Sequence, residues 1–433
     1  MDFITQTKEV PVVAQYDVVV CGGGPAGFIA AIAAARGGAR TALVERYGFL
    51  GGMATAGLVA PISVFNYNGR RIIGGIPWEF VERLEEIGGA EEEKPLGNIT
   101  FSPEKYKLVA QRMLLEAGVT LYLHSYLTGC RKADGRITHI VIENKNGAEA
   151  IGANYFIDGT GDADLAVYAG VPMQPAGETL QPASLIFMLG GVDTDALPMI
   201  RHSQQGVNYH DLDIRRILTE LREKEEVPVF GGPWYCGVLS KGVVLLNMTR
   251  IQADMADNRE ATAAECLMRE HVHLFTELLR KHVPAFRDAT LLCTATQTGV
   301  RETRRIKGFH TLTGEEYLQA VDFPDAISRG CHPVDIHAAS STQQRCEFLK
   351  DAAFIPYHCL IAPDFPNLLV AGRSFSADAI ASASVRVQAS VMGLGQAAGA
   401  AAALCVRSNA DVAQVDIEAL RKVLTEYGTN LTA

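Results

Sequence analysis

The chain has 433 residues, of which 48% are hydrophobic and 20% charged. This is the composition of a folded protein with room for two or three domains, and it excludes the disordered, collagen-like and coiled-coil classes. At pH 7, 39 basic and 49 acidic residues give a net charge of −10. This charge argues against a nucleic-acid partner, because binding to phosphate backbones needs clustered positive charge.

Three features of the chain bear on its location and on metal binding. Residues 1–13 lack a basic segment followed by an apolar one, so we expect no secretory signal and a cytoplasmic location. The most apolar stretch, 391–406, is short for a membrane span and contains Gln396, so we predict a buried helix and no membrane partner. The nine cysteines form no Cys-x-x-Cys motif, and we predict no metal site.

The N-terminal residues predict a βαβ unit. The β-branched run 16–21 indicates a strand, the alanine-rich stretch 25–36 a helix, and the apolar run 41–45 a second strand. Two strands joined by a crossover helix lie parallel in one sheet. This segment therefore predicts an α/β fold with a Rossmann-like, doubly wound parallel sheet.

The following segments extend this sheet. Ser102 and Pro103 indicate the start of a helix over 104–116. Between 126 and 151, apolar and polar residues alternate across two turn signals, which predicts a three-stranded antiparallel meander. Residues 154–158 then predict another buried strand.

From about residue 171 the alternation of strands and helices fades. Strand-like runs at 184–189 and 238–249 and helical stretches at 211–225 and 257–282 predict an inserted substrate or cap domain of mixed α+β structure.

The C-terminal residues return to the first pattern. Residues 367–371 predict a strand, and 384–404 a helix of small residues. We therefore expect a discontinuous nucleotide-binding domain and a second domain, with these limits: 1–170 and 350–433 for the first, and 171–349 for the second, to which part of 58–100 can also belong.

A glycine fingerprint separates the first predicted strand from the first helix. Gly22, Gly24 and Gly27 have the spacing Gly-x-Gly-x-x-Gly, and Glu45 follows 23 residues after Gly22. In dinucleotide-binding units such glycines allow a tight turn, close approach to a pyrophosphate and close helix packing, while the acid binds ribose hydroxyls. Glycines that serve only a turn are the alternative, but strand, helix, spacing and acid all favour a dinucleotide.

The residues after this unit carry a family resemblance. ERYGFLGGMAT, at 45–55, resembles the E-R-x-x-x-x-G-G-x-x-T continuation of FAD-dependent oxidoreductases with the glutathione-reductase-like (GR2-type) fold. YFIDGTGDADLA, GVRETRRIKG, HPVDIH, IPYHCLIAP and NLLVAGRSFSA resemble the same family, whose bacterial members are largely uncharacterised. The resemblance implies a Rossmann-like FAD-binding domain and FAD as the cofactor.

The resemblance also implies which residues contact FAD. Glu45 and Arg46 would bind the AMP ribose, and a helix beginning near Ser384 and Val385 would direct backbone amides at the flavin. The whole implied set is Gly22, Gly24, Ala26, Gly27, Glu45, Arg46, Gly51, Gly52, Thr55, Leu127, Gly161, Asp162, Gly372, Arg373, Ser384 and Val385.

Three side chains are candidates for catalysis: His337, Tyr357 and Arg301. Hydride transfer from a C–OH or C–NH centre to flavin N5 needs a group that accepts the heteroatom proton, and His337 or Tyr357 can do so. The alternatives are a His337 that packs against Asp335 and a Tyr357 that lies at a domain boundary. Arg301 can bind a substrate carboxylate, or it can belong to an arginine–glutamate network between the domains.

We therefore expect an enzyme, a dehydrogenase or oxidase that transfers hydride from a small polar metabolite to flavin N5. Electrons would then pass to a carrier or to oxygen, because no second glycine fingerprint marks a separate NAD(P)H domain. An FAD-dependent reductase of an activated double bond and a non-catalytic dinucleotide-binding redox sensor are the alternatives. The substrate, the electron acceptor or donor, and assembly into a homo-oligomer stay open.

Overall fold

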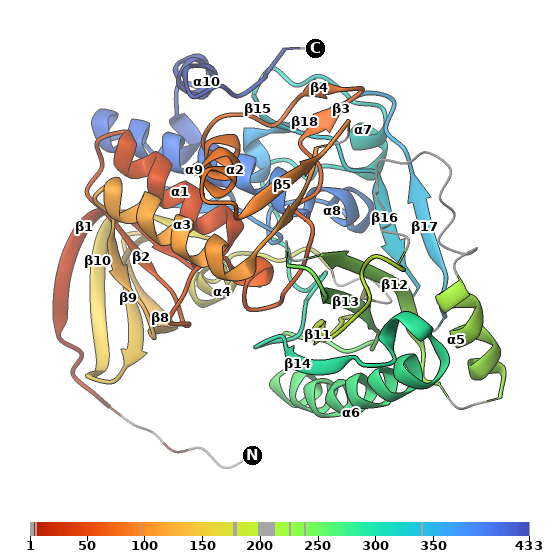
Figure 1. The fold of residues 1–433 in the computed structure, drawn as a ribbon. Coiled ribbons are helices and arrows are strands. Elements are labelled where there is room, and N and C mark those ends of the chain that lie inside the picture. Colours follow the sequence, from red (N-terminus) through yellow and green to blue (C-terminus); the bar gives the residue numbers. More distant parts are fainter. Residues whose placement is uncertain are drawn as a thin grey trace.

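Two sheets and the helices around them make up most of the molecule, seen in the computed structural model of Figure 1. In the described part of the chain, the larger sheet has seven strands and the smaller one four. The structure describes residues 4, 7–95, 97–175, 180–197, 213–224, 227–237, 240–338 and 341–432.

The larger sheet is parallel in its centre. Its strands lie in the order β7 (Thr120–Tyr122), β2 (Thr41–Val44), β1 (Val12–Cys21), β10 (Gly147–Asp158), β9 (Arg136–Asn144) and β8 (Tyr126–Ala133), and β19 (Leu368–Val370) also pairs with β10. Strands β7, β2, β1, β10 and β19 pair in parallel. The α/β fold with a parallel sheet is therefore observed.

Strand β10 differs from the prediction, which placed separate strands before and after residue 152. Its first half pairs antiparallel with β9, which pairs antiparallel with β8, and its second half continues into the parallel centre of the sheet. The strand is continuous because no turn residue pair interrupts the apolar run across Gly152 and Ala153.

Helices α1 (Pro25–Arg36) and α9 (Gln388–Ser408) pack against each other over one face of the larger sheet (Figure 1). A Cβ on Gly395 or Gly399 would lie 2.1 Å from the carbonyl oxygen of a residue in α1, so glycine permits this close approach. Among the described helices, α9 alone is long and apolar enough to span a membrane, but 89% of its apolar window is buried inside the protein.

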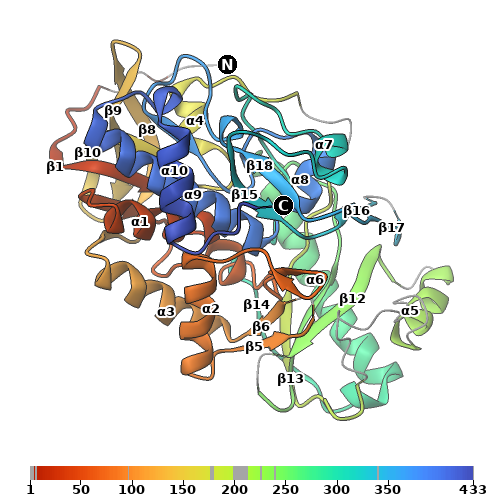
Figure 2. The same ribbon diagram turned by 90° about the horizontal axis from the view of Figure 1, so that it is seen from above.

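The smaller sheet is antiparallel and lies beside the larger sheet, as Figures 1 and 2 both show. Helix α6 (Asn258–His282) packs against it and begins at Asp257, whose side chain accepts hydrogen bonds from two backbone amides of the first turn. The strands of the smaller sheet lie in the order β12 (Phe230–Gly237), β13 (Val243–Thr249), β11 (Phe187–Gly190) and β14 (Thr290–Thr294). Helix α5 (Asp213–Glu223) contacts β12. Residues 238–239, part of one predicted strand, and 211–212 and 225, at the ends of one predicted helix, lie outside the described residues.

Part of the segment that follows the smaller sheet packs with α1 and α9. Leu312, Tyr317, Ile327 and Val334 are buried in the same hydrophobic core as these two helices, so part of the segment 312–349 packs with the larger sheet. The domain limits stay a prediction. The remaining elements are β3 (Asn66–Tyr67), β4 (Arg70–Arg71), α2 (Ile76–Glu86), β5 (Ala90–Glu93), β6 (Asn98–Phe101), α3 (Pro103–Glu116), α4 (Asp164–Ala169), α7 (Gly314–Leu318), β15 (Ala326–Gly330), β16 (Val334–His337), β17 (Gln344–Glu347), β18 (Ala353–Pro356), α8 (Ala379–Val385) and α10 (Ile417–Glu426).

Candidate active site

Four parallel strands, β2, β1, β10 and β19, end at one edge of the larger sheet. The loops that follow them carry Glu45–Arg46, Gly22–Gly24, Gly159–Gly161 and Gly372–Arg373, and residues from all four line a cleft of about 630 Å³. We name it the first cleft. Ligands of open α/β sheets bind at the carboxyl ends of the strands, so this cleft is where the expected dinucleotide would bind.

The backbone of the first cleft fits a pyrophosphate. Gly22 has a φ of +95°, and a Cβ there would lie 2.5 Å from the carbonyl oxygen of Gly159. A Cβ on Gly27 would lie 1.8 Å from the carbonyl oxygen of Gly22. Helix α1 begins directly after Gly24, with no side chain capping its N-terminus. The amides of its first turn can therefore bind a phosphate group.

Glu45 is fixed at the wall of the first cleft. Its carboxylate accepts hydrogen bonds from the amides of Gly23, at 2.7 Å, and Tyr47, at 2.9 Å. Burial raises the pKa of Glu45, against the stabilising effect of these backbone donors. The carboxylate therefore lies where the sequence placed the acceptor for ribose hydroxyls.

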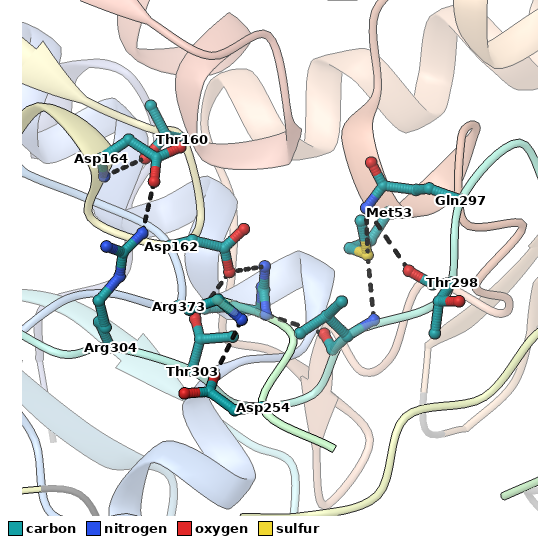
Figure 3. A network of polar contacts seen from close by, with 12 residues as sticks. Met53, Thr160, Asp162, Asp164, Asp254, Gln297, Thr298, Thr303, Arg304 and Arg373 are labelled. Atoms are coloured by element: carbon teal, nitrogen blue, oxygen red, sulfur yellow. Dashed lines mark hydrogen bonds and ion pairs between the residues drawn. The ribbon is translucent and has the colours of Figure 1, made fainter. Parts of the chain in front are cut away.

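A polar network joins the loops after β10 and β19 to the segment 297–305 (Figure 3). Arg373 donates to the Asp162 carboxylate at 3.0 Å and to the Val300 carbonyl at 2.9 Å, and Thr303 donates to the same carboxylate at 2.7 Å. Arg373 also lines the first cleft. Its guanidinium is thus held in place from two sides.

A second ion pair lies next to this network. Arg304 donates to Asp164 at 2.6 Å (Figure 3). Burial and the neighbouring carboxylates Asp162 and Asp158 raise the pKa of Asp164 to about 6, against the attraction of Arg304. Arg305 pairs with Glu302 at 2.5 Å, and both side chains are buried. Arg304 and Arg305 thus form ion pairs, whereas Arg301, for which the sequence offered an arginine–glutamate network as one alternative, donates to the Pro182 carbonyl and the Ser184 hydroxyl.

The helix start predicted at Ser384 and Val385 is wrong. Both residues lie at the C-terminal end of the short helix α8, and the next helix, α9, begins at Gln388 after the cap residue Val387. Gln388 lines the first cleft, and its buried Oε1 has no hydrogen-bond partner among the described residues. An acceptor without a partner fits a bound cofactor that carries N–H or O–H donors.

Most of the predicted cofactor residues line the first cleft or support its wall. Gly22, Gly24, Ala26, Glu45, Arg46, Gly52, Gly161, Gly372 and Arg373 line the first cleft. Four others support its wall: Gly27, Gly51 and Thr55 hold the turns, through contacts such as Thr55 Oγ1 donating to the Leu50 carbonyl at 2.6 Å, and Asp162 holds Arg373. Leu127, in β8, is half-buried against the core on one face of the sheet and lines neither cleft described here.

A second cleft, of about 790 Å³, shares Met53, Arg373, Arg386 and Gln388 with the first. Its polar lining comes from segments far apart in the chain, as these further residues show: Ser63, Ser184, Asn247, Arg301, His332, Asp335 and His337. The two clefts are therefore adjacent, and the second has the mixed polar and apolar character of a substrate pocket.

Both ring nitrogens of His337 are occupied. Its Nδ1 accepts from the guanidinium of Arg250 at 3.1 Å, because arginine can only donate, and its Nε2 therefore carries the proton and donates to Asp335 at 2.9 Å. Burial, followed by the positive charge of Arg301, lowers the pKa of His337 to about 3. The imidazole is neutral and both of its nitrogens make hydrogen bonds. This favours the alternative in which His337 packs against Asp335 over a role as general base.

Tyr357 lies away from both clefts. Its side chain is 1% exposed, and its hydroxyl donates to the backbone carbonyl of Val412 at 2.8 Å. Burial raises the pKa of Tyr357 well above its ordinary value. Of the three catalytic candidates, the structure therefore brings Arg301 and His337 to the second cleft and leaves Tyr357 in the core.

Several lining residues were not predicted from the sequence. Tyr47, Met53, Gln297 and Val391 line the first cleft. Asn247 lines the second cleft, and its buried Oδ1 has no partner among the described residues. Tyr47 and Met53 lie inside the recognised motif at 45–55 and could have been found there, whereas Gln297 and Asn247 follow no motif.

Comparisons with known proteins agree with this geometry. The family described as FAD dependent oxidoreductase matches residues 17–424. Dihydrolipoyl dehydrogenase of Trypanosoma brucei brucei is 60% identical over 42 residues, which cover 10% of this chain and only 9% of that protein.

Two solved structures align with most of this chain at low sequence identity. A geranylgeranyl bacteriochlorophyll reductase-like protein from Thermoplasma acidophilum is 14% identical, with a TM-score of 0.45 over 97% of this chain and 94% of its own. A p-nitrophenol 4-monooxygenase from Pseudomonas putida is 13% identical, with a TM-score of 0.45 over 96% and 83%. On the strength of the family match across 17–424, the chain belongs to the FAD-dependent oxidoreductases and is an enzyme with FAD as its cofactor.

Proposed function

We propose that this enzyme is a dehydrogenase or oxidase of a small polar metabolite that binds in the second cleft. The observation that carries the proposal is the wall that the two clefts share, formed by Met53, Arg373, Arg386 and Gln388. A polar pocket that adjoins a cofactor cleft is where a substrate can meet the cofactor. We retain the predicted domain limits as part of the proposal. Residues from 171–349 form much of the lining of the second cleft.

The reaction divides into a hydride and a proton. Bound FAD would supply a two-electron acceptor for the hydride of the substrate C–H bond. The adjoining hydroxyl or amino group loses its proton, so that C–OH becomes C=O or C–NH becomes C=N. Oxygen or a redox carrier would be the final electron acceptor. The residues of the chain bind the substrate and accept this proton.

Two histidines, His332 and His337, line the second cleft. Both ring nitrogens of His337 make hydrogen bonds, to Arg250 and to Asp335. We therefore propose His337 as a residue that positions Asp335 and Arg250.

The first cleft supports the details of cofactor binding that we also propose. The amides at the start of α1 would hold the pyrophosphate, Glu45 the AMP ribose, and Arg373 the phosphate or ribitol. Gln388 would accept a hydrogen bond from the cofactor through its unpartnered Oε1. The fold type that we propose is the glutathione-reductase-like GR2 type.

The proposal is tested by anaerobic reduction of the purified, FAD-loaded protein. A panel of hydroxy acids, sugars and amines is compared with NADH and NADPH, and the visible flavin band is followed in time. We expect a metabolite to bleach the band.

The other outcomes contradict the proposal. Bleaching only by NADH or NADPH would indicate a reductase or monooxygenase. No bleaching by any compound would leave the substrate outside the proposed class.

A further inference from the structure

Arg301 is held on one side and open on the other. Its Nη1 donates to the Pro182 carbonyl at 2.6 Å and to the Ser184 hydroxyl at 2.8 Å, and both partners are neutral. Within the described ranges, no hydrogen bond or ion pair forms at its Nε or Nη2. These two atoms form the planar edge that matches the two oxygens of a carboxylate.

The surroundings of Arg301 do not neutralise its charge. Burial, followed by the positive charges of Arg386 and Arg250, lowers its pKa to about 9 against a smaller opposing effect of Asp335, so the guanidinium is still charged at pH 7 but is destabilised. Buried charges are normally paired, because the loss of hydration is otherwise uncompensated. An anion that enters the second cleft would supply the missing pair.

The one acid of the second cleft among the described residues is already engaged. Asp335 accepts from His337 at 2.9 Å and from Gln344 at 2.5 Å, and Arg386 lies 3.6 Å from it. Burial opposes its ionisation, yet the hydrogen bond from His337 and the nearby positive charges hold the pKa of Asp335 below its usual range. Asp335 therefore balances Arg386, and Arg301 is left in excess.

A second group without a hydrogen-bond partner, the side-chain oxygen of Asn247, indicates which other group the ligand carries. The buried Oδ1 of Asn247 lines the same cleft and accepts no hydrogen bond from the described residues. A ligand with a hydroxyl or ammonium group would satisfy it. We infer that the second cleft binds a small organic carboxylate, with its carboxylate on the Nε–Nη2 edge of Arg301 and a hydroxyl or amino group facing Asn247.

This inference names the substrate class of the proposed reaction and rests on that proposal for the identity of the second cleft as the substrate site. Among hydroxy acids, sugars and amines, it selects hydroxy acids or amino acids. A neutral sugar or a simple amine would leave the charge of Arg301 without a partner, and an amine would add a further cation to the cleft.

The test uses two unreactive probes of the same shape, propionate and propionamide, and inorganic phosphate as a different anion. Each is titrated calorimetrically into the FAD-loaded protein. We expect propionate to bind about 10-fold or more tightly than propionamide, because a charge-assisted hydrogen bond to a buried group is worth more than a neutral one. Arg301→Met should weaken propionate about 10- to 100-fold and leave propionamide unchanged.

Two further variants keep the test decisive. Arg280→Met removes an exposed arginine of α6, which pairs with Glu277, and should change nothing. Arg301→Lys keeps the charge but loses the planar edge, and it carries the test if Arg301→Met does not fold or retain flavin. We expect it to weaken propionate about 5-fold or more.

Equal affinities for propionate and propionamide, or no effect of either Arg301 variant, would overturn the inference. Phosphate that binds more tightly than propionate through Arg301 would overturn it in favour of a phosphorylated ligand. Failure of the proposed function looks different: propionate would bind through Arg301, but no metabolite would bleach the flavin. If a sugar bleaches the flavin and propionate does not bind, the function stands and the carboxylate is refuted.

Discussion

Replacement of His337 by Gln should remove a pH dependence from the stability of the protein. In the folded state the pKa of His337 is about 3, whereas an unfolded histidine has a pKa of about 6.5. Between these values the unfolded chain binds the extra proton, so the free energy of unfolding falls as the pH falls. Linkage gives a loss of about 2 kcal/mol between pH 7 and pH 5 from this group alone.

Two carboxyl groups of the site also titrate, Asp335 beside His337 and Asp164 beside Arg304, with different windows and signs. The pKa of Asp335 is lowered, so its contribution is complete above the ordinary aspartate value of about 3.9 and is lost only at lower pH. The pKa of Asp164 is raised to about 6, so protonation between about 6 and 4 favours the folded state and partly masks the loss. The informative quantity is therefore the difference between wild type and His337→Gln at each pH.

The assay is guanidinium chloride unfolding of the FAD-loaded protein from pH 5 to pH 8. We expect the wild type to lose about 2 kcal/mol more than His337→Gln between pH 7 and pH 5. His273→Gln, at an exposed position on α6, is the matched control and should keep the wild-type slope. If the free energy of unfolding depends on pH equally in the wild type and in His337→Gln, His337 is not a neutral imidazole held by two hydrogen bonds, and the reasoning is refuted.

Three further substitutions test the fold around the site. Gly27→Ala places a Cβ 1.8 Å from the carbonyl oxygen of Gly22 and should abolish flavin retention, whereas Gly129→Ala, whose Cβ meets no atom within 4 Å, should keep it; equal flavin absorbance would contradict this. Asp378→Ala removes the cap of α8 and should cost about 1 to 2 kcal/mol of unfolding free energy, while Asp378→Asn should recover most of it. Tyr357→Phe should cost about 1 to 2 kcal/mol with an unchanged rate of flavin reduction; a rate loss of 100-fold would restore its catalytic role.

The first cleft could be predicted largely from the sequence because its determinants are local. Strand, glycine turn and helix follow one another within residues 16–36, and the parallel βαβ rule then places Glu45 at the same sheet edge. The start of α9 was misplaced because the small, helix-compatible residues run from Ala379 to Ser408 without a proline, and the break at Val387 carries no sequence signal.

The second cleft could not be assembled from the sequence, because its residues come from distant segments. Asp335 and His337 alternate on one strand, so their contact could be anticipated from the two-residue period. The other ring nitrogen of His337 accepts from Arg250, which lies 87 residues earlier in the chain, directly after β13 of the smaller sheet. This contact decides which nitrogen of His337 carries the proton. Asn247 enters the cleft through the same sheet, whose packing no local pattern specifies.

The central claim is that a small polar metabolite delivers its electrons to FAD from the second cleft. The most direct measurement is anaerobic titration of the FAD-loaded protein with hydroxy acids and amino acids, with sugars, simple amines, NADH and NADPH in parallel. The account predicts that one carboxylate bleaches the flavin band with one equivalent per flavin and is recovered as its keto or imino product. Bleaching by NADH or NADPH alone, with no metabolite active, would contradict it.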